Sequence, residues 1–293
     1  MKKLFTIIVI AAIASLPCMA NFFDGGAGVG DPSWSTAANW DDDTVPTSTS
    51  GDAQAINVPG YGVVVNNAGA QAQAVNVGTW SWAGTLTIAS AGTLNIVGNL
   101  LIANDVGEIG DVINHGQLTS LATYMQAGIG SLENNGTFTS GLLILGNLAD
   151  SISMVSNTGD MNINGWLYLS LLGQDSVFNM NGGTLDITGK LEMPQDGIGH
   201  LNLHGGTINT AELGINGNGG YTIEVTFGEL IAIGDHTGGL DFMIGAGLIT
   251  STAGRTPESY YDIDNDETTL SSTPEPAAFG LLAILGLAFL RRK

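Results

Sequence analysis

Alternating carboxylates near the C-terminal end of the chain are the clearest candidates for metal chemistry. Asp262, Asp264 and Asp266 occupy positions one, three and five of a short acidic stretch. Oxygen ligands at this spacing are typical of calcium-binding loops, in which position six is Gly and position twelve is Glu. Here those two positions hold Glu267 and Thr273. Because two of the motif's positions are missing, the pattern favours a solvated acidic linker, with a calcium contact as the alternative and no other cofactor expected.

Tryptophan side chains are the candidates for contact with a sugar. Trp80 and Trp82 alternate across Ser81, so a β-strand would turn both rings to one face. Trp166 is a third candidate. Such rings could form a platform on which a sugar stacks, or they could cover the core as a cap.

Catalytic patterns are scarce in this sequence. It has no nucleophile motif of the Gly-x-Ser-x-Gly type and no phosphate-binding loop. A lyase of acidic sugars needs a cation, and only Lys190 and Arg255 remain away from the chain ends. A hydrolase needs two carboxylates about 5 to 9.5 Å apart. Four acids could supply such a pair, although no spacing selects one: Asp160, Asp186, Glu192 and Glu212. We therefore expect no catalytic residues and no enzyme.

Charge and composition narrow the class of protein. The 293 residues carry 27 acidic and 7 basic side chains, a net charge of −20. Five basic residues lie at the chain ends, so residues 21–273 carry two basic and 26 acidic side chains. A surface this acidic repels nucleic acid and attracts cations. The 43 glycines, few charges and 44% hydrophobic residues indicate an all-β protein with many turns.

The centre of the chain repeats with a period of 20 to 24 residues. In each unit a glycine precedes a polar and then a large apolar residue, and these glycines are Gly92, Gly116, Gly136, Gly159, Gly183, Gly206 and Gly228. Short alternating strands at this period predict stacked coils, each of which buries its apolar face against the next. We expect a parallel, right-handed β-helix of about seven coils, with an antiparallel sandwich as the alternative.

Small and polar residues fit the corners of such coils. Glycine adopts positive φ without steric cost, and asparagine tolerates it. Asn114, Asn134 and Asn157 each stand two residues before a repeated glycine. Stacked asparagines at one corner could also hydrogen-bond along the axis.

The flanking segments are candidates for the caps that a solenoid needs. We expect residues 21–80 to form an N-terminal cap and the first strands. Residues 81–256 would form the β-helix repeats and the C-terminal closure, and residues 257–273 an acidic linker. In the cap, Trp34 and Trp40 are expected to cover the open first coil, and stacking on sugar rings is the alternative. The order Trp-Ser, Asn-Trp, Pro and Asp over residues 34–52 resembles the opening of secreted autotransporter-like β-helical proteins.

Residues 1–20 have the pattern of a signal peptide. Lys2 and Lys3 precede an apolar run, and small residues lead to a cleavage site after Ala20. Cleavage there removes Cys18, the only cysteine, so the exported chain would fold without disulfides. Lipidation at Cys18 is the alternative, and Pro17 directly before it makes a poor fit.

Residues 274–293 combine three features in order. A tripeptide, Pro274-Glu275-Pro276, comes first and is followed by 14 apolar residues over 277–290. The chain then ends on the basic residues Arg291, Arg292 and Lys293. As a helix the apolar run would be about 21 Å long, shorter than the roughly 30 Å core of a bilayer. The basic end would stay in the cytoplasm, with everything upstream outside. These features predict a provisional membrane anchor, and an ordinary uncut anchor is the alternative.

This tail resembles the PEP-CTERM sorting signal of bacterial exported proteins. The resemblance implies that an exosortase recognises the tail and cuts near its Pro-Glu-Pro tripeptide, after transient attachment to the membrane. Because PEP-CTERM proteins are associated with bacteria that make exopolysaccharide, it also implies a place at the cell surface or in the extracellular matrix. We therefore expect an exported structural or adhesive protein. The alternatives are a polysaccharide-binding module and a β-helical polysaccharide hydrolase or lyase.

Overall fold

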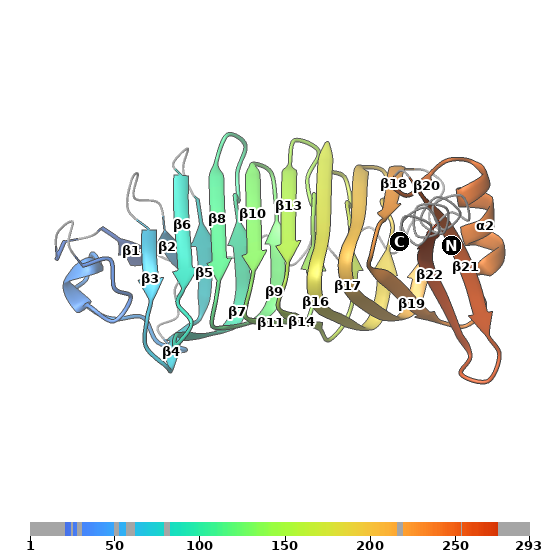
Figure 1. Cartoon of the computed structure of the whole chain (residues 1–293). Coiled ribbons are helices and arrows are strands. Elements are labelled where there is room, and N and C mark those ends of the chain that lie inside the picture. Colours follow the sequence, from blue (N-terminus) through green and yellow to red (C-terminus); the bar gives the residue numbers. More distant parts are fainter. Residues whose placement is uncertain are drawn as a thin grey trace, which may run out of the picture.

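A computed structural model describes residues 21–24, 26–27, 31–49, 53–56, 62–78, 83–215, 219–252 and 254–274. These residues form a parallel β-solenoid of about eight turns. Figure 1 shows it from the blue N-terminal end to the red C-terminal end. The predicted all-β parallel β-helix is confirmed, and its right-handed sense stays a prediction.

Each coil contributes strands to three faces. The first face contains β3 (Gly62–Val65), β6 (Ala83–Ile88), β8 (Ile109–Asn114), β10 (Ile129–Asn134), β13 (Ile152–Asn157), β18 (Gly220–Val225) and β20 (Ile249–Thr250). The second contains β4 (Ala70–Ala72), β11 (Thr137–Ser140), β14 (Asp160–Ile163) and β19 (Glu229–Ile233). The third contains β1 (Asn21–Phe23), β2 (Ala53–Ile56), β5 (Ala74–Val77), β12 (Leu143–Ile144) and β15 (Leu167–Tyr168). Four longer strands turn corners and join several faces: β7 (Thr93–Ile102), β9 (Gln117–Met125), β16 (Asp175–Glu192) and β17 (Ile198–Gly214).

The strands of successive coils pair in register, so their inward side chains stack into a continuous apolar interior. On the second face, one inward row is formed by Leu94, Leu118, Phe138, Met161, Leu185, Ile208 and Leu230. Each of these side chains is at most 1% exposed. Burial of one such side chain contributes roughly 1.5–3 kcal/mol. This stack stabilises residues 21–274, which contain no cysteine.

The repeated glycines line the corner between the first and second faces. The residues that follow them are paired in register: Thr93, Gln117, Thr137, Asp160, Thr184, Thr207 and Glu229. A Cβ added at Gly136 would lie 2.3 Å from the carbonyl oxygen of Gly116, and one at Gly159 would lie 2.1 Å from that of Gly136. Of the seven, only Gly183 and Gly206 have positive φ. The corner therefore requires glycine mainly because neighbouring coils approach closely, and less for the positive φ that the sequence suggested.

Asn114, Asn134 and Asn157 stack beside this corner and are fully buried. Nδ2 of Asn114 donates to Oδ1 of Asn134 at 2.7 Å, and Nδ2 of Asn134 donates to Oδ1 of Asn157 at 2.7 Å. The backbone carbonyls of Thr137 and Asp160 accept further bonds from the first two amides. The axial ladder expected from the sequence is confirmed, and it gives each buried amide a hydrogen-bond partner.

Aromatic side chains close the N-terminal end. Trp34 and Trp40 are 2% and 1% exposed, and their ring centroids lie 4.9 Å apart in an edge-to-face arrangement. Phe23 packs against Trp40 at 5.3 Å, and the short helix η1 (Ala37–Asn39) lies between the tryptophans in sequence. The predicted capping role of Trp34 and Trp40 is confirmed.

Coils begin before the first repeated glycine. Strands β1, β2 and β5 pair in parallel, as do β3 and β6. Since Ala70 pairs with Leu94, Ala68 stands where the next coil has Gly92. The glycine signature therefore misses this coil, and about eight turns replace the predicted seven.

The C-terminal end is closed by a helix and a hairpin (Figure 1). Helix α2 (Thr237–Gly245) adds Leu240 and Met243 to the apolar core. Strands β21 (Arg255–Asp262) and β22 (Glu267–Pro274) form an antiparallel hairpin. Strand β22 also pairs antiparallel with β19 of the last coil.

This hairpin corrects the prediction of an acidic linker over residues 257–273. Leu270 of β22 is fully buried and pairs with Leu230 of β19. Thr268 and Ser272 alternate with it on the inward face and donate hydrogen bonds to backbone carbonyls of the last coils. The alternation of one buried face outweighs the acidic composition of the segment.

Candidate functional site

One outward strip of the third face combines aromatic rings with charged side chains. We call it the Trp166 strip, and it contains seven residues on five successive coils: Tyr124, Ile144, Trp166, Tyr168, Lys190, Glu192 and Glu212. Tyr124 pairs with Ile144, which pairs with Tyr168, which pairs with Glu192. The strip therefore follows the long axis of the solenoid. At about 4.8 Å between strands it extends roughly 19 Å.

Trp166 is the most exposed ring of the strip, with 45% of its surface accessible. Its centroid lies 5.7 Å from that of Tyr168, and the two ring planes are inclined by 45°. Leu167 between them is fully buried, so the alternation of the chain turns both rings outward. On the next coil, a Cβ added at Gly189 would lie only 2.7 Å from Cδ1 of Trp166. The absence of a side chain at that position makes room for the indole.

Lys190 joins the two carboxylates of the strip. Its Nζ lies 2.6 Å from Glu192 and 3.3 Å from Glu212. The hydrogen bond to Glu192 is the main cause that raises the pKa of Lys190, although burial acts in the opposite direction. Burial raises the pKa of Tyr168, and the charge of Glu192 adds to this effect. At neutral pH the strip therefore presents a charged lysine beside neutral tyrosines.

Gly214 makes room for this charged cluster. A Cβ added there would lie 2.1 Å from Cε of Lys190 and 2.2 Å from a carboxylate oxygen of Glu192. Both side chains thus extend over the following coil. The carboxylate of Glu192 is held close to the backbone, with 7% of its side chain exposed, whereas 64% of the Glu212 side chain is exposed.

The carboxylates considered for hydrolysis are used in other ways. On the second face Asp160 accepts a hydrogen bond at 3.1 Å from a threonine of the next coil, and Asp186 accepts one at 2.7 Å from an asparagine. Glu192 and Glu212 do come together, but around the ammonium group of Lys190. A glycosidase needs the space between its two carboxyl groups for the sugar or a water molecule. This pair therefore resembles a structural ion cluster more than a hydrolytic centre.

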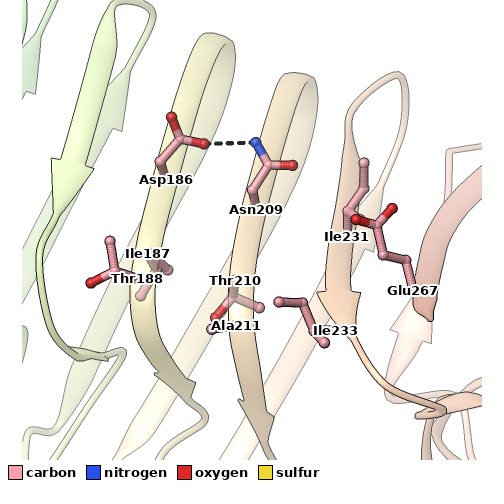
Figure 2. A pocket seen from close by; sticks show the side chains of 9 residues that line it. All are labelled: Asp186, Ile187, Thr188, Asn209, Thr210, Ala211, Ile231, Ile233 and Glu267. Carbon is pink, nitrogen blue, oxygen red and sulfur yellow. Dashed lines mark hydrogen bonds between the residues drawn. The ribbon is translucent and has the colours of Figure 1, made fainter. Parts of the chain in front are cut away.

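A shallow groove of about 310 Å³ lies on the second face near the C-terminal end (Figure 2). Its lining consists of Asp186, Ile187, Thr188, Asn209, Thr210, Ala211, Ile231, Ile233 and Glu267. Asn209 donates to Asp186, and Glu267 stands on the far side of the groove in this view. The lining has no basic or histidine side chain to complement these acids, so we assign no chemistry to it.

The three aspartates predicted to contact calcium lie at the turn of the β21–β22 hairpin. Asp262 accepts hydrogen bonds from the side chain of Asn265 (2.8 Å) and from the backbone N–H of Asp264 (2.9 Å), which lower the pKa of Asp262 in that order. Asp266 accepts a hydrogen bond from the hydroxyl of Tyr261 at 2.7 Å. Within the described ranges, no group of three or more acidic, histidine or cysteine side chains is arranged to hold a metal ion. The structure therefore gives the carboxylates of Asp262 and Asp266 hydrogen bonds within the hairpin turn and does not gather the three aspartates into such a group.

Most residues predicted for export, processing and sugar contact lie outside the described residues: Ala20, Trp80, Trp82, Glu275, Pro276, Arg291, Arg292 and Lys293. Pro274 is described, and it ends β22 opposite Arg255. No helix in the part of the chain that the structure describes is long and apolar enough to cross a membrane. The roles assigned to the two chain ends stay predictions.

Sequence reasoning selects Trp166 for sugar contact and considers Lys190, Glu192 and Glu212 for catalysis, but it does not bring these residues together. It does not select the other three members of the strip. Tyr168 stands two residues after Trp166, as Trp82 does after Trp80. The same alternation could therefore have placed Tyr168 beside Trp166. Tyr124 is placed in the strip only by the register of the third face. The glycine repeat does not fix that register, because coils shift between the second and third faces.

Comparison with known proteins adds no relative. No family model, curated protein or solved structure matches the chain. The functional interpretation therefore depends on the sequence and on the geometry of the solenoid.

Proposed function

We propose that the protein is an exported structural or adhesive component of the cell surface or of an exopolysaccharide matrix. The observation that carries this proposal is the apolar core, which forms one continuous cluster from Phe23 near the first coils to Leu270 in the C-terminal hairpin. Such a core makes a stiff body, because each coil is held by both neighbours. A stiff body with repeated outer faces suits a scaffold that meets a repeating polymer.

The two chain ends support the cellular part of the proposal. The pattern of residues 1–20 is that of a signal peptide, and residues 274–293 resemble a tail that an exosortase recognises. The membrane is then a transient partner, reached through the apolar run 277–290. Export also agrees with a fold that needs no disulfide.

Charge supports the exclusion of nucleic acid as a partner. Lys190 and Arg255 are the only basic residues between 21 and 273. Lys190 is paired with Glu192 and Glu212. Arg255 donates to Ser272 and stacks 4.8 Å from the ring centroid of Phe227. With both cations engaged, the acidic surface offers nothing to phosphate groups.

The proposal is tested in a host that contains an exosortase. The full chain is expected to reach the cell surface or the medium, and mass spectrometry should show a C-terminus near the tripeptide. Replacing Pro274, Glu275 and Pro276 by Ala should leave the protein in the membrane fraction with its tail intact. Ile263→Ala, an exposed change in the hairpin turn, is the matched control and should be processed normally.

Two results would contradict the proposal. One is a wild-type chain that stays inside the cell, and the other is normal processing of the alanine variant. The enzymatic alternative has a separate readout, since a hydrolase or lyase would shorten the exopolysaccharide of the producing organism in size-exclusion profiles. We expect the polymer to keep its size.

A further inference from the structure

We propose that the Trp166 strip binds a neutral polysaccharide chain along the long axis of the solenoid. This proposal deepens the proposed function. It rests on that function only in assuming that the protein is exported to the place where the polysaccharide is. The shape, the polar groups and the charge of the strip all fit such a polymer.

The aromatic part of the strip suits the apolar face of a sugar ring. Trp166 leaves 45% of its surface exposed, and its indole is held in place by the contact with Tyr168. Rings of this kind combine a large apolar surface with a polar edge and lose little freedom on binding. Because the Trp166 and Tyr168 planes are inclined by 45°, they can support two consecutive sugar units that are rotated against each other.

The polar part of the strip suits sugar hydroxyls, which both donate and accept hydrogen bonds. Lys190 carries three N–H donors, and Glu192 and Glu212 occupy two directions around its Nζ. The third donor and the exposed carboxylate of Glu212 lie beside the rings, on the coils that follow Trp166. Convergent polar groups next to an apolar surface are the usual composition of a ligand site.

The length of the strip points to a polymer. Five coils repeat the outward positions at about 4.8 Å per step, so Tyr124 and Glu212 stand roughly 19 Å apart along the axis, with Ile144 between them only 3% exposed. Tyr124 lies two coils before Tyr168, across the buried Ile144, and offers a second aromatic contact on the same line. A chain of sugars offers a matching one-dimensional repeat, whereas a single sugar would cover only the part around Trp166.

Charge decides which polymer fits. Residues 21–273 carry 26 acidic and two basic side chains, so the surface repels acidic polysaccharides. The lysine of the strip is already neutralised by two carboxylates. We therefore assign the strip to uncharged polysaccharides.

Native electrophoresis in gels that contain hydroxyethyl cellulose, a neutral glucan, tests the proposal with the exported chain. The wild-type protein should migrate more slowly than in gels without polymer, and polygalacturonate gels should not retard it. Trp166→Ala should weaken the retardation about tenfold or more, as expected for a central aromatic contact. Phe242→Ala removes an aromatic side chain that is 72% exposed on α2, away from the strip, and should bind like the wild type.

A second variant keeps the test independent of folding. Glu212→Ala changes an exposed side chain and should weaken binding about threefold with an unchanged thermal unfolding curve. The proposal is overturned if the wild type is not retarded, if only polygalacturonate retards it, or if Trp166→Ala and Glu212→Ala bind like the wild type.

Failure of this proposal and failure of the proposed function are distinguishable. Processing of Trp166→Ala in the exosortase host reports on export alone and should be normal. A processed wild-type chain without retardation would overturn the strip and leave the exported scaffold. Retardation of a chain that is never exported would support the strip and overturn the cellular role.

Discussion

At the scale of single residues, the asparagine ladder is the clearest polar element of the core. Asn134 accepts from Asn114 and donates to Asn157 inside the solenoid. Asn134→Ala removes the acceptor of the Asn114 amide and the donor to Oδ1 of Asn157. We expect it to lower the free energy of unfolding by about 2–4 kcal/mol, because each unsatisfied buried group costs ~1–3 kcal/mol. Urea unfolding measures the change.

The matched control for the ladder is Asn95→Ala. Asn95 is an exposed strand residue on the second face. Its replacement should change the free energy of unfolding by no more than about 0.5 kcal/mol. Equal losses in the two variants would show that asparagine at a corner has no special role.

Glycine-to-alanine changes should have opposite signs at two sites. Gly159→Ala places a methyl group 2.1 Å from the carbonyl oxygen of Gly136 and forces the coils apart, at a cost of about 1–3 kcal/mol or more. Gly238→Ala in α2 meets no atom within 4 Å and should stabilise the protein by about 0.5–1 kcal/mol. Thermal unfolding of both variants distinguishes close packing from a general preference for alanine.

The Trp166 strip should make the protein sensitive to alkali. The pKa of Lys190 is raised above its ordinary 10.5, and the pKa values of Tyr124 and Tyr168 are raised above 10.0. Each group binds its proton more tightly in the folded chain than in the unfolded chain. The three groups therefore contribute to the free energy of unfolding below about pH 10, and this contribution is lost as the pH rises through their raised pKa values. Urea unfolding at several alkaline pH values should show this loss, and Tyr168→Phe should reduce it. An identical pH dependence in Tyr168→Phe would contradict the assignment.

Prediction from sequence worked for these residues where a repeat constrained them. The position of Asn134 relative to its glycine was enough to place it at a corner, and the register of the coils then stacked it. The strip was harder, since its residues come from different coils whose third-face lengths vary. Trp166 was selected for sugar contact, and three of its neighbours were considered only for catalysis, so the structure was needed to join them and to add the tyrosines.

At the scale of elements, the C-terminal hairpin should be essential for closing the solenoid. Leu270 of β22 is fully buried against the last coil. Leu270→Ala should lower the free energy of unfolding by about 2–5 kcal/mol, as for other buried leucines. Ile263→Ala at the turn of the same hairpin, where the side chain is 79% exposed, should change it by no more than about 0.5 kcal/mol. Urea unfolding of both variants would show whether the hairpin is a cap or only an appendage.

The same hairpin shows why elements outside the repeat were less predictable. Its acidic residues lie mainly at the turn and on the outer surface, and they dominate the composition of the segment. The signal for β22 was the alternation of Thr268, Leu270 and Ser272, which is short and has only one large apolar residue. The tertiary contact with β19 decides the structure, and sequence composition does not contain that contact.

At the scale of the whole molecule, the coils should be removable one at a time. Thr137 and Asp160 occupy the same position in neighbouring coils, so deletion of residues 137–159 joins Gly136 to Asp160 in register. Strand β10 would then pair with β16, because both strands pair in parallel with β13 in the complete chain. The shortened protein should fold cooperatively with lower stability, because repeat proteins gain stability coil by coil. Circular dichroism and thermal unfolding measure this.

A deletion of half a coil provides the contrast. Removing residues 137–148 takes out the second- and third-face strands of one coil and leaves the later coils out of register with the earlier ones at the junction. This variant should not fold cooperatively. Similar unfolding curves for both deletions would contradict a solenoid in which register determines stability.

Parallel stacking also determines how the molecule responds to a load. Strands β1 and β22 lie at opposite ends of the solenoid, so tension between them acts along the axis (Figure 1). The hydrogen bonds between coils point in the same direction and separate one coil after another. Each coil of 20 to 24 residues then releases roughly 70–80 Å of extended chain. A filament held by this protein would therefore yield in steps, and the protein would act as an extensible tether that dissipates force before either end is lost.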